Sequence, residues 1–441
     1  MKRYNTYKDS GADWIGDIPE SWNIVKIKFI TDIYSGNSLN SDLKEVFQSE
    51  NEEDLPYVST KDIDIDNNTL NYDNGLKIPL EDSFYKVAPR GSFLLCIEGA
   101  NAGKKLAFVE QDCCFVNKLA CFNFPNKFLF YYSQSHPFKT QFFNSISGLI
   151  GGVSISVLKE FISTIPSPKE QTQIANYLDY KTGLIDNIIA QKEELIQKLK
   201  EQRQAIINEA VTKGLNPNAI LKDSGIEWLG EIPEHWVVPK LKFLTLQIID
   251  GAHFTPTYVE KGIPFLRVTD IQSEKINLDK VKFIPESEHL DLIKRCNPER
   301  GDILLSKNGT IGITKVIDWD WEFSIFVSLC LIKFNKKLTA RYFSHFFNSS
   351  IVDQQIKMSS KTTSVTNLHL EKIKELLIAI PTDTNEQIAI SDYLDQKLSE
   401  FDLILDETFN SIEKLKEYRQ SLISEAVTGK IDVRDWQVPN N

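Results

Sequence analysis

The most constraining feature of this chain is an internal repeat. Residues 8–22 (KDSGADWIGDIPESW) return as residues 222–236 (KDSGIEWLGEIPEHW), and residues 199–212 return, with substitutions, as residues 415–428. The interval of about 215 residues is far longer than the roughly 20 to 50 residues that are typical of solenoid repeats. The chain is therefore a duplicated pair of domains, and a duplicated molecule suits a target that itself has two parts.

The composition is that of a multi-domain globular protein. The 441 residues are 41% hydrophobic and 25% charged, which is ordinary for chains that bury real cores. No apolar run approaches the roughly 18 residues of a membrane span, and residues 1–6 lack the apolar segment of a signal peptide. We therefore expect a cytoplasmic protein that binds no membrane. The six cysteines form no CxxC pair, which predicts reduced core residues rather than a disulfide framework or a zinc site.

The net charge of −11 argues against strong non-specific binding of nucleic acid. It does not exclude a nucleic-acid target, because a binding face needs only a local cluster of cations.

Each half of the chain follows the same order: a Trp/Pro/Gly segment that we call the clasp (residues 8–22 and 222–236), a variable head, and a long charged segment. The long segments carry apolar or heptad-compatible positions at alternating intervals of three and four residues, which predicts helices of about 40 residues, or about 60 Å. Such a narrow apolar stripe needs a helical partner. We expect the two helices to pair with each other as an antiparallel coiled coil; the alternative is that each packs separately on its own head.

The heads show short strands bounded by Gly, Pro, Asn and Asp, together with helical stretches, and this mixture predicts an α/β fold. Residues 91–99 and 301–309 form a matching strand and glycine turn, and residues 56–63 and 264–271 form a matching earlier strand. The predicted domains are the first clasp and head (1–165), the first long helix (166–214), the linker, second clasp and second head (215–380), the second long helix (381–431) and a tail (432–441).

No catalytic constellation is present in the sequence. Residues 99–105 (GANAGKK) resemble a phosphate-binding loop, but the glycines are one residue too close and no Ser or Thr follows the lysine, so we interpret the segment as a turn. No GxGxxG, HExxH, GxSxG or Asn-Pro-Pro-aromatic sequence occurs, and the six histidines lack metal-ligand spacing.

Three segments could contact DNA, and two of them also fit a simpler role. Residues 250–258 (DGAHFTPTY) and 357–367 (KMSSKTTSVTN) offer donors and acceptors for bases and phosphates, but Asp and Thr often bond to their own backbone in exposed loops. Residues 147–154 (SGLIGGVS) would bring backbone amides close to a ligand. The tryptophans of the clasps could dock a partner, but we expect them to fasten the chain to its own heads.

The order of these features resembles that of type I restriction-modification specificity subunits. The resemblance is carried by the Glu-Gln pairs and Tyr-Leu-Asp triplets of the two helices (170–171, 177–179, 386–387, 393–395), by both clasps, and by residues 250–256 and 301–312. It implies two target-recognition domains, each recognising one part of an asymmetric two-part site in double-stranded DNA, with the helices setting the gap between the parts.

The resemblance also implies that the chain is not itself an enzyme. It would dock two modification subunits, which methylate adenine with S-adenosylmethionine, and restriction subunits, which translocate and cut DNA with ATP and magnesium. The chain itself would hold no cofactor and no metal.

On this interpretation, Arg or Lys would recognise guanine and Asn or Gln adenine, while phosphates would supply most of the affinity. The predicted DNA-contacting residues are Lys61, Asn101, Lys104, Lys105 and Ser154 in the first head, and His253, Thr255, Arg267, Lys307, Asn308, Lys361 and Asn367 in the second. The first head lacks a clear counterpart of residues 250–256.

Two alternatives belong to other classes. A scaffold with two protein-binding heads on a coiled coil would suit the acidic charge. An enzyme with duplicated active sites would need matched catalytic residues in both heads, and the sequence shows none.

Overall fold

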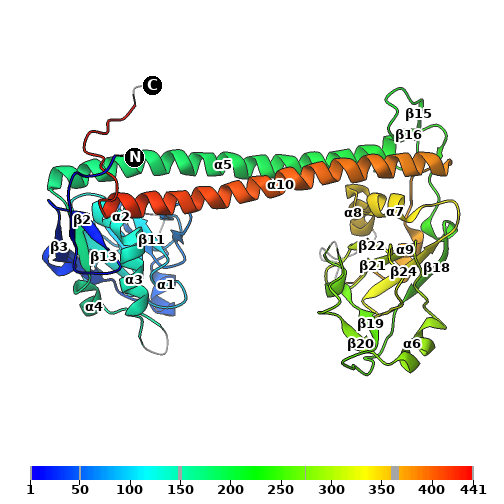
Figure 1. The fold of residues 1–441 in the computed structure, drawn as a ribbon, viewed down its shortest axis with the longest axis horizontal. Coiled ribbons are helices and arrows are strands. Elements are labelled where there is room, and N and C mark those ends of the chain that lie inside the picture. Colours follow the sequence, from blue (N-terminus) through cyan, green and yellow to red (C-terminus); the bar gives the residue numbers. More distant parts are fainter. Residues whose placement is uncertain (1, 49–50, 148–150, 274, 359–366, 440–441) are drawn as a thin grey trace. The chain divides into compact units, whose positions relative to one another are not determined.

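The computed structural model describes residues 2–48, 51–147, 151–273, 275–358 and 367–439. It divides into two compact units: residues 1–193 with 409–441, and residues 194–408. Each unit contains one head together with part of α5 (Pro168–Lys213) and part of α10 (Thr384–Val427), the two long helices in Figure 1. The mixed α/β fold with duplicated heads and two long helices is therefore confirmed.

The head of the first unit is built on two four-stranded sheets. One has the strand order β11-β10-β13-β4 and the other β8-β5-β12-β9. The strands are β1 Tyr7–Asp9, β2 Asp17–Pro19, β3 Asn23–Lys26, β4 Asp32–Ser35, β5 Leu55–Val58, β6 Ile63–Asp64, β7 Thr69–Leu70, β8 Lys77–Ile78, β9 Val87–Ala88, β10 Phe93–Cys96, β11 Leu106–Phe108, β12 Cys113–Phe115, β13 Leu119–Asn123 and β14 Ile162–Ile165. The helical elements are η1 Ile27–Phe29, α1 Ser41–Val46, α2 Phe128–Gln134, α3 His136–Asn144 and α4 Ile155–Lys159.

The head of the second unit repeats this plan with a four-stranded sheet (β18-β24-β21-β22) and a three-stranded sheet (β20-β19-β23). The strands are β15 Leu221–Asp223, β16 Glu231–Pro233, β17 Trp236–Val237, β18 Thr245–Asp250, β19 Ile263–Leu266, β20 Lys282–Ile284, β21 Ile303–Ser306, β22 Thr314–Val316, β23 Ser324–Ile325, β24 Leu329–Phe334 and β25 Ile380–Pro381. The helical elements are η2 Leu241–Phe243, η3 Val268–Asp270, α6 Glu286–Ile293, α7 Ala340–Phe347, α8 Ser350–Met358 and α9 Leu370–Glu375.

A glycine joins the two sheets at the same place in each head. Gly36 follows β4, and a Cβ atom there would lie 1.8 Å from the carbonyl oxygen of Phe115. Gly251 follows β18, and a Cβ atom there would lie 2.0 Å from the carbonyl oxygen of Ile325. Since neither distance is possible between real atoms, both positions require glycine. Gly36 and Gly251 are therefore equivalent positions, from which the residues of the two heads can be aligned.

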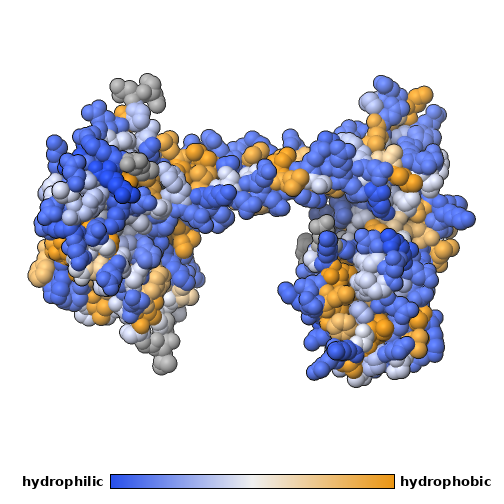
Figure 2. Space-filling model, viewed as in Figure 1, coloured by the Kyte–Doolittle hydropathy of each residue, from blue (hydrophilic) through white to orange (hydrophobic). Residues whose placement is uncertain are grey.

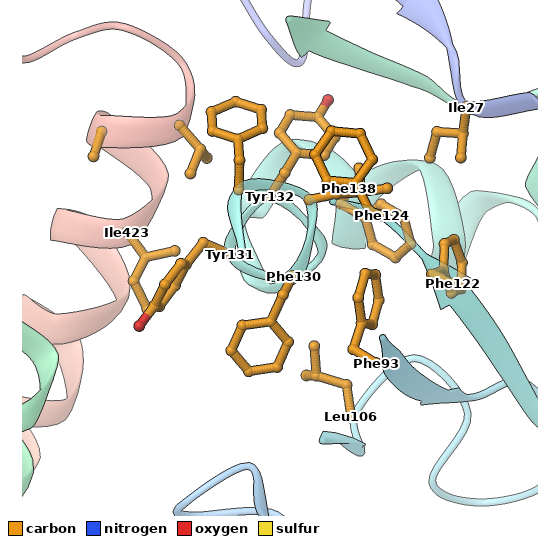
Figure 3. Packing of buried hydrophobic residues seen from close by; sticks show 14 of the residues in the cluster. Ile27, Phe93, Leu106, Phe122, Phe124, Phe130, Tyr131, Tyr132, Phe138 and Ile423 are labelled. Carbon is orange, nitrogen blue, oxygen red and sulfur yellow. The ribbon is translucent and has the colours of Figure 1, made fainter. Parts of the chain in front are cut away.

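An aromatic core fixes the first head to the long helices. The rings of Phe93 and Phe122 stack with centroids 4.7 Å apart, and burying one such side chain stabilises the fold by about 1.5–3 kcal/mol. Figure 3 shows α2 between this sheet and α10, with Phe130 directed to the sheet and Tyr131 beside Ile423. The helix α2 therefore packs against both the sheet and α10 and holds the head against the long helices.

The long helices pair in opposite directions within each unit. In the first unit Arg419 Nε lies 2.8 Å from Asp186 Oδ1, so the end of α10 lies beside the first part of α5. In the second unit Arg203 Nε lies 3.4 Å from Asp402 Oδ1, so the end of α5 lies beside the first part of α10. These contacts confirm the expected antiparallel pairing.

The predicted apolar stripe is only partly buried. Leu178 and Leu422 are buried, whereas Ile188 and Leu195 are exposed. A straight α-helix has 3.6 residues per turn and drifts away from a 3.5-residue repeat, which turns some of these positions outward.

The second tryptophan of each clasp fastens the chain to its own unit, as expected, whereas Trp14 in the first clasp is 42% exposed. Trp22 and Trp236 are fully buried, and the Trp236 indole donates to Glu386 at the start of α10 (3.0 Å). In the first unit the corresponding helix residue, Glu170, instead accepts a bond from the hydroxyl of Tyr4 (2.6 Å).

All six cysteines are free and buried. Burial raises the pKa of the Cys296 thiol to about 12, which is the behaviour of a reduced core residue. No helix among the described residues is both long and apolar enough to cross a membrane.

Candidate nucleic-acid interface

Four of the seven predicted contact residues of the second head gather where β18 and β21 end. These two strands flank β24 and run in the same direction, so Asp250 and Lys307 come to the same edge of the sheet. Lys307 Nζ lies 3.2 Å from Asp250 Oδ2, and the two side chains are only 7% and 8% exposed. His253 Nε2 lies 3.3 Å from the same oxygen. The charge of Lys307 is therefore neutralised inside the head.

A distant segment completes this edge. Asn308 and Asn367 form an isolated antiparallel bridge, and the amide of Leu368 donates to the carbonyl of Lys307 (2.8 Å). The Oδ1 atoms of Asn308, Asn367 and Asp250 are buried and have no hydrogen-bond partner among the described residues, although Oδ2 of Asp250 is paired with Lys307. Four predicted contact residues, His253, Lys307, Asn308 and Asn367, thus meet at one edge of the fold.

The segment after Asp250 presents its side chains outward. His253, Phe254 and Thr255 are exposed in succession. A cavity of about 220 Å³ lies beside them and is lined in part by Phe254 and Arg295, and Arg295 Nη1 donates to the carbonyl of Gly251 (3.3 Å). The sequence analysis did not select Phe254 or Arg295, and for Arg295 no local pattern signals a position beside this segment.

Arg267 has a local role. Its guanidinium Nε lies 3.2 Å from Asp270 Oδ2, and its backbone amide donates to the same oxygen (2.8 Å) at the start of η3. It is about one-third exposed, so part of it faces solvent. Lys361 lies outside the described residues.

The first head builds the corresponding edge from different side chains. The amide of Val153 donates to the carbonyl of Ile97 (2.9 Å), as the amide of Leu368 does to that of Lys307 in the second head. Glu98 forms a β-bridge with Gly152, as Asn308 does with Asn367. Ser35 pairs with β13 where Asp250 pairs with β24. The buried ion pair of the second head is therefore replaced by Ser35 and Ile97.

The predicted residues of the first head differ in their availability. Lys61, Asn101 and Lys104 are exposed. Lys105 Nζ donates to the carbonyls of Thr60 (3.1 Å) and Ile63 (2.9 Å), so it ties the turn containing Lys61 to the turn after β10. Ser154 is the N-cap of α4.

Lys104 also borders a cavity of about 600 Å³ between the first head and the long helices. Its other cations are Lys139, Lys416 and Arg419, and its acids are Asp66, Asp186 and Glu193. Burial and the nearby Arg419 lower the pKa of Lys139. Since Arg419 is paired with Asp186, the cavity holds a mixture of charges rather than a purely basic surface.

Comparison with known proteins agrees with this architecture. The profile of the family described as "Type I restriction modification DNA specificity domain" matches residues 19–201 and 254–414. The specificity subunit of the type I restriction enzyme EcoKI from Escherichia coli K12 is 24% identical and aligns over 96% of this chain and 92% of its own length. The MjaVIII specificity subunit from Methanocaldococcus jannaschii is 23% identical over 95% of each chain.

Solved structures show the same fold. A chain from a structure concerning complex assembly and conformational transition of the type I R-M system superposes with a TM-score of 0.73 at 17% identity, over 94% of this chain and 99% of that one. The HsdS subunit from Thermoanaerobacter tengcongensis gives a TM-score of 0.53 at 16% identity, over 94% and 98%. The chain belongs to the DNA-specificity subunits of type I restriction-modification systems.

Proposed function

We propose that each head recognises one part of an asymmetric two-part site in double-stranded DNA. The observation that carries this proposal is a repeated frame with unlike side chains at one edge. Ser35, Ile97, Glu98 and Gly152 occupy the positions that Asp250, Lys307, Asn308 and Asn367 occupy in the second head. A common frame docks both heads on DNA in one manner, while different side chains select different bases.

The long helices set the gap between the two parts of the site. α5 has 46 residues and α10 has 44, so each extends about 65–70 Å at 1.5 Å per residue. Recognition in major grooves one helical turn apart requires about 34–36 Å, and longer gaps need a longer spacer. Helices of this length can supply such a spacer.

Enzymatic activity resides in partner subunits under this proposal. Two modification subunits methylate adenine with S-adenosylmethionine, restriction subunits translocate and cleave with ATP and magnesium, and the chain itself holds no cofactor, all in the cytoplasm. Exposed apolar side chains on the helices, including Leu184, Ile188, Leu403 and Ile404, provide surface for docking; Figure 2 shows hydrophobic residues interrupting the hydrophilic surface of these helices. The net charge of −11 means that the isolated chain binds DNA weakly.

Single-molecule methylation sequencing tests this proposal. Genomic DNA is sequenced from cells that express this chain with the candidate modification subunit. The proposal predicts a two-part asymmetric motif with a fixed gap and one methylated adenine on each strand. Absence of a new motif, despite a demonstrated complex with the modification subunit, would contradict it. Absence of any complex would favour the protein-binding scaffold.

A further inference from the structure

The two heads share one exposed surface in addition to their buried frame. In the first head Lys26 and Lys28 form ion pairs with Glu160, and Lys28 lies over the ring of Phe29. In the second head Lys240 and Lys242 form ion pairs with Glu375, and Lys242 lies over the ring of Phe243. We call each group of four residues a Lys-Phe patch. The patches repeat although the two heads differ in the side chains at the edge proposed to contact DNA, which we call the recognition edge.

The internal geometry of the two patches is the same. The two lysines of the first patch form ion pairs with the two carboxylate oxygens of Glu160, at 2.7 and 2.6 Å. The two lysines of the second patch pair with Glu375 in the same way. These contacts lower the pKa of each glutamate to about 2, so both carboxylates are ionised at neutral pH. Each patch therefore carries two positive charges and one negative charge.

A buried residue anchors each patch. Ile27 and Leu241 are fully buried between the two lysines of their patches. The Ile27 amide donates to the carbonyl of Phe161 and the Leu241 amide to that of Leu376, both at 2.7 Å. The phenylalanine that follows is held on a rigid element yet faces solvent: Phe29 is 72% exposed and Phe243 is 62% exposed.

Common ancestry of the halves does not by itself explain this repetition. Exposed positions are free to diverge where nothing binds them, and elsewhere on the heads they have done so. Phe254, exposed three residues after Gly251, corresponds to the buried Leu39, three residues after Gly36. An exposed phenylalanine that is retained in both halves indicates contact with something that both heads meet.

The position and chemistry of the patch favour a protein over DNA. Phe29 precedes β4 whereas Gly36 follows it, so the patch lies at the opposite end of the strand from the recognition edge; Phe243 and Gly251 flank β18 in the same way. Exposed aromatic side chains with a charged rim are typical of protein interfaces.

We infer that the Lys-Phe patches of the two heads are equivalent docking sites for two copies of one protein, which offers each phenylalanine an apolar pocket bordered by acidic side chains. This inference rests on the proposed function, under which that protein is the modification subunit. It assigns one copy to each head, in addition to any contact with the long helices.

The test counts bound copies on four single variants and one double variant. Phe29→Ser and Phe243→Ser each remove one phenylalanine, and the double variant removes both. Leu80→Ser and Leu290→Ser are matched controls, because these side chains are 66% and 52% exposed, one in each head and outside the patches. The full-length chain is titrated with the candidate modification subunit, without DNA, and bound copies are counted by native mass spectrometry.

We expect the wild type and both controls to bind two copies. Each single patch variant binds one copy at wild-type affinity and the second at least about tenfold more weakly, and the double variant weakens both. Two copies at wild-type affinity on the double variant would overturn the inference while leaving the proposed function intact. Unchanged copy number together with a reduced salt dependence of DNA binding by the assembled complex would also overturn it, because the patches would then contact phosphates. A wild-type chain that binds no copy would contradict the docking part of the proposed function itself.

Discussion

Lys307 Nζ lies 3.2 Å from Asp250 Oδ2 inside the second head, and both side chains are more than nine-tenths buried. This ion pair joins the end of β18 to the end of β21, at the edge of the sheet where four predicted DNA-contacting residues meet. Because the first head has Ser35 and Ile97 at the corresponding positions, the pair belongs to the second head alone and makes a specific prediction about its stability.

Replacing Lys307 by Ile should strongly destabilise the second unit, because the Asp250 carboxylate would remain buried without its counter-ion. The expected loss is about 3–5 kcal/mol in the free energy of unfolding. The double variant Asp250→Ser with Lys307→Ile, which introduces the residues of the first head, should recover most of this loss. Urea unfolding of the full chain measures both; a double variant as unstable as the single one would contradict the assignment.

The glycines that join the two sheets should not tolerate a side chain. Gly36→Ala or Gly251→Ala places a methyl group within about 2 Å of a backbone carbonyl oxygen, and the resulting displacement of the sheets should cost at least about 1–3 kcal/mol. Gly183→Ala, within α5, is the matched control, because a Cβ atom there meets nothing within 4 Å. It should stabilise the chain by about 0.5–1 kcal/mol. Thermal unfolding of the three variants compares them directly.

The second unit should lose stability as the pH falls below about 6.5. His345 Nε2 lies 2.8 Å from Asp395 Oδ1. Burial lowers the pKa of His345; Asp395 opposes this shift, and Arg341 and Arg203 add to it. A lowered pKa means that the unfolded state takes up a proton before the folded state does. Stability from this histidine is therefore present above its unfolded pKa of about 6.5 and is lost as the pH falls through the lower folded value.

The first head suggests the control for this pH dependence. There the hydroxyl of Tyr131 donates to Asp179 (2.6 Å) at the position where the second head uses His345 and Asp395. His345→Tyr should therefore retain the contact and flatten the decline. The measurement is the difference in melting temperature between the variant and the wild type from about pH 7.5 to pH 5.5; a difference that does not change with pH would contradict the role of His345.

Substitution of the exposed recognition residues should change one half of the DNA motif. His253→Ala together with Thr255→Ala removes two exposed side chains and leaves the Lys307–Asp250 ion pair in place. Each lost base contact costs about 1–3 kcal/mol of discrimination. The methylated motif should become degenerate in one half only, while the other half serves as an internal control. Degeneracy in both halves, or in neither, would count against these residues.

Phosphate-contacting residues should behave differently. Lys104→Ala should weaken binding of the assembled complex to all sequences alike. It should also lower the slope of the logarithm of the binding constant against the logarithm of salt concentration by about one.

Arg267→Ala and Lys361→Ala test the predicted contacts of the second head. Unchanged binding to the cognate site would remove each residue from the set of contacts. Lys105→Ala should instead loosen the turns that its amine ties together, which a melting curve detects.

The sequence predicted the architecture better than the site. The repeated segments, the apolar periodicity and the clasp tryptophans are each short patterns of neighbouring residues, and the structure confirms the duplicated heads, the paired helices and the burial of Trp22 and Trp236. These features are encoded by residues that are close together in the sequence, so pattern analysis can detect them.

The environment of single polar side chains could not be predicted in the same way. Lys307 faces a buried carboxylate that is 57 positions away in the chain, and Lys105 bonds to carbonyls of a turn in another part of the head. Arg295 approaches Gly251 from the end of a separate helix. Each of these contacts depends on strand order, which a single sequence does not specify.

The most direct test of the account gives the chain two identical heads. Residues 23–165 replace residues 237–380, so that both recognition edges carry the first head's side chains while both clasps and both long helices are retained. Methylation sequencing with the modification subunit should then show a symmetric motif, in which the half recognised by the first head is repeated in inverted orientation across a gap of unchanged length. An unchanged asymmetric motif would contradict the claim that each head recognises one half of the site.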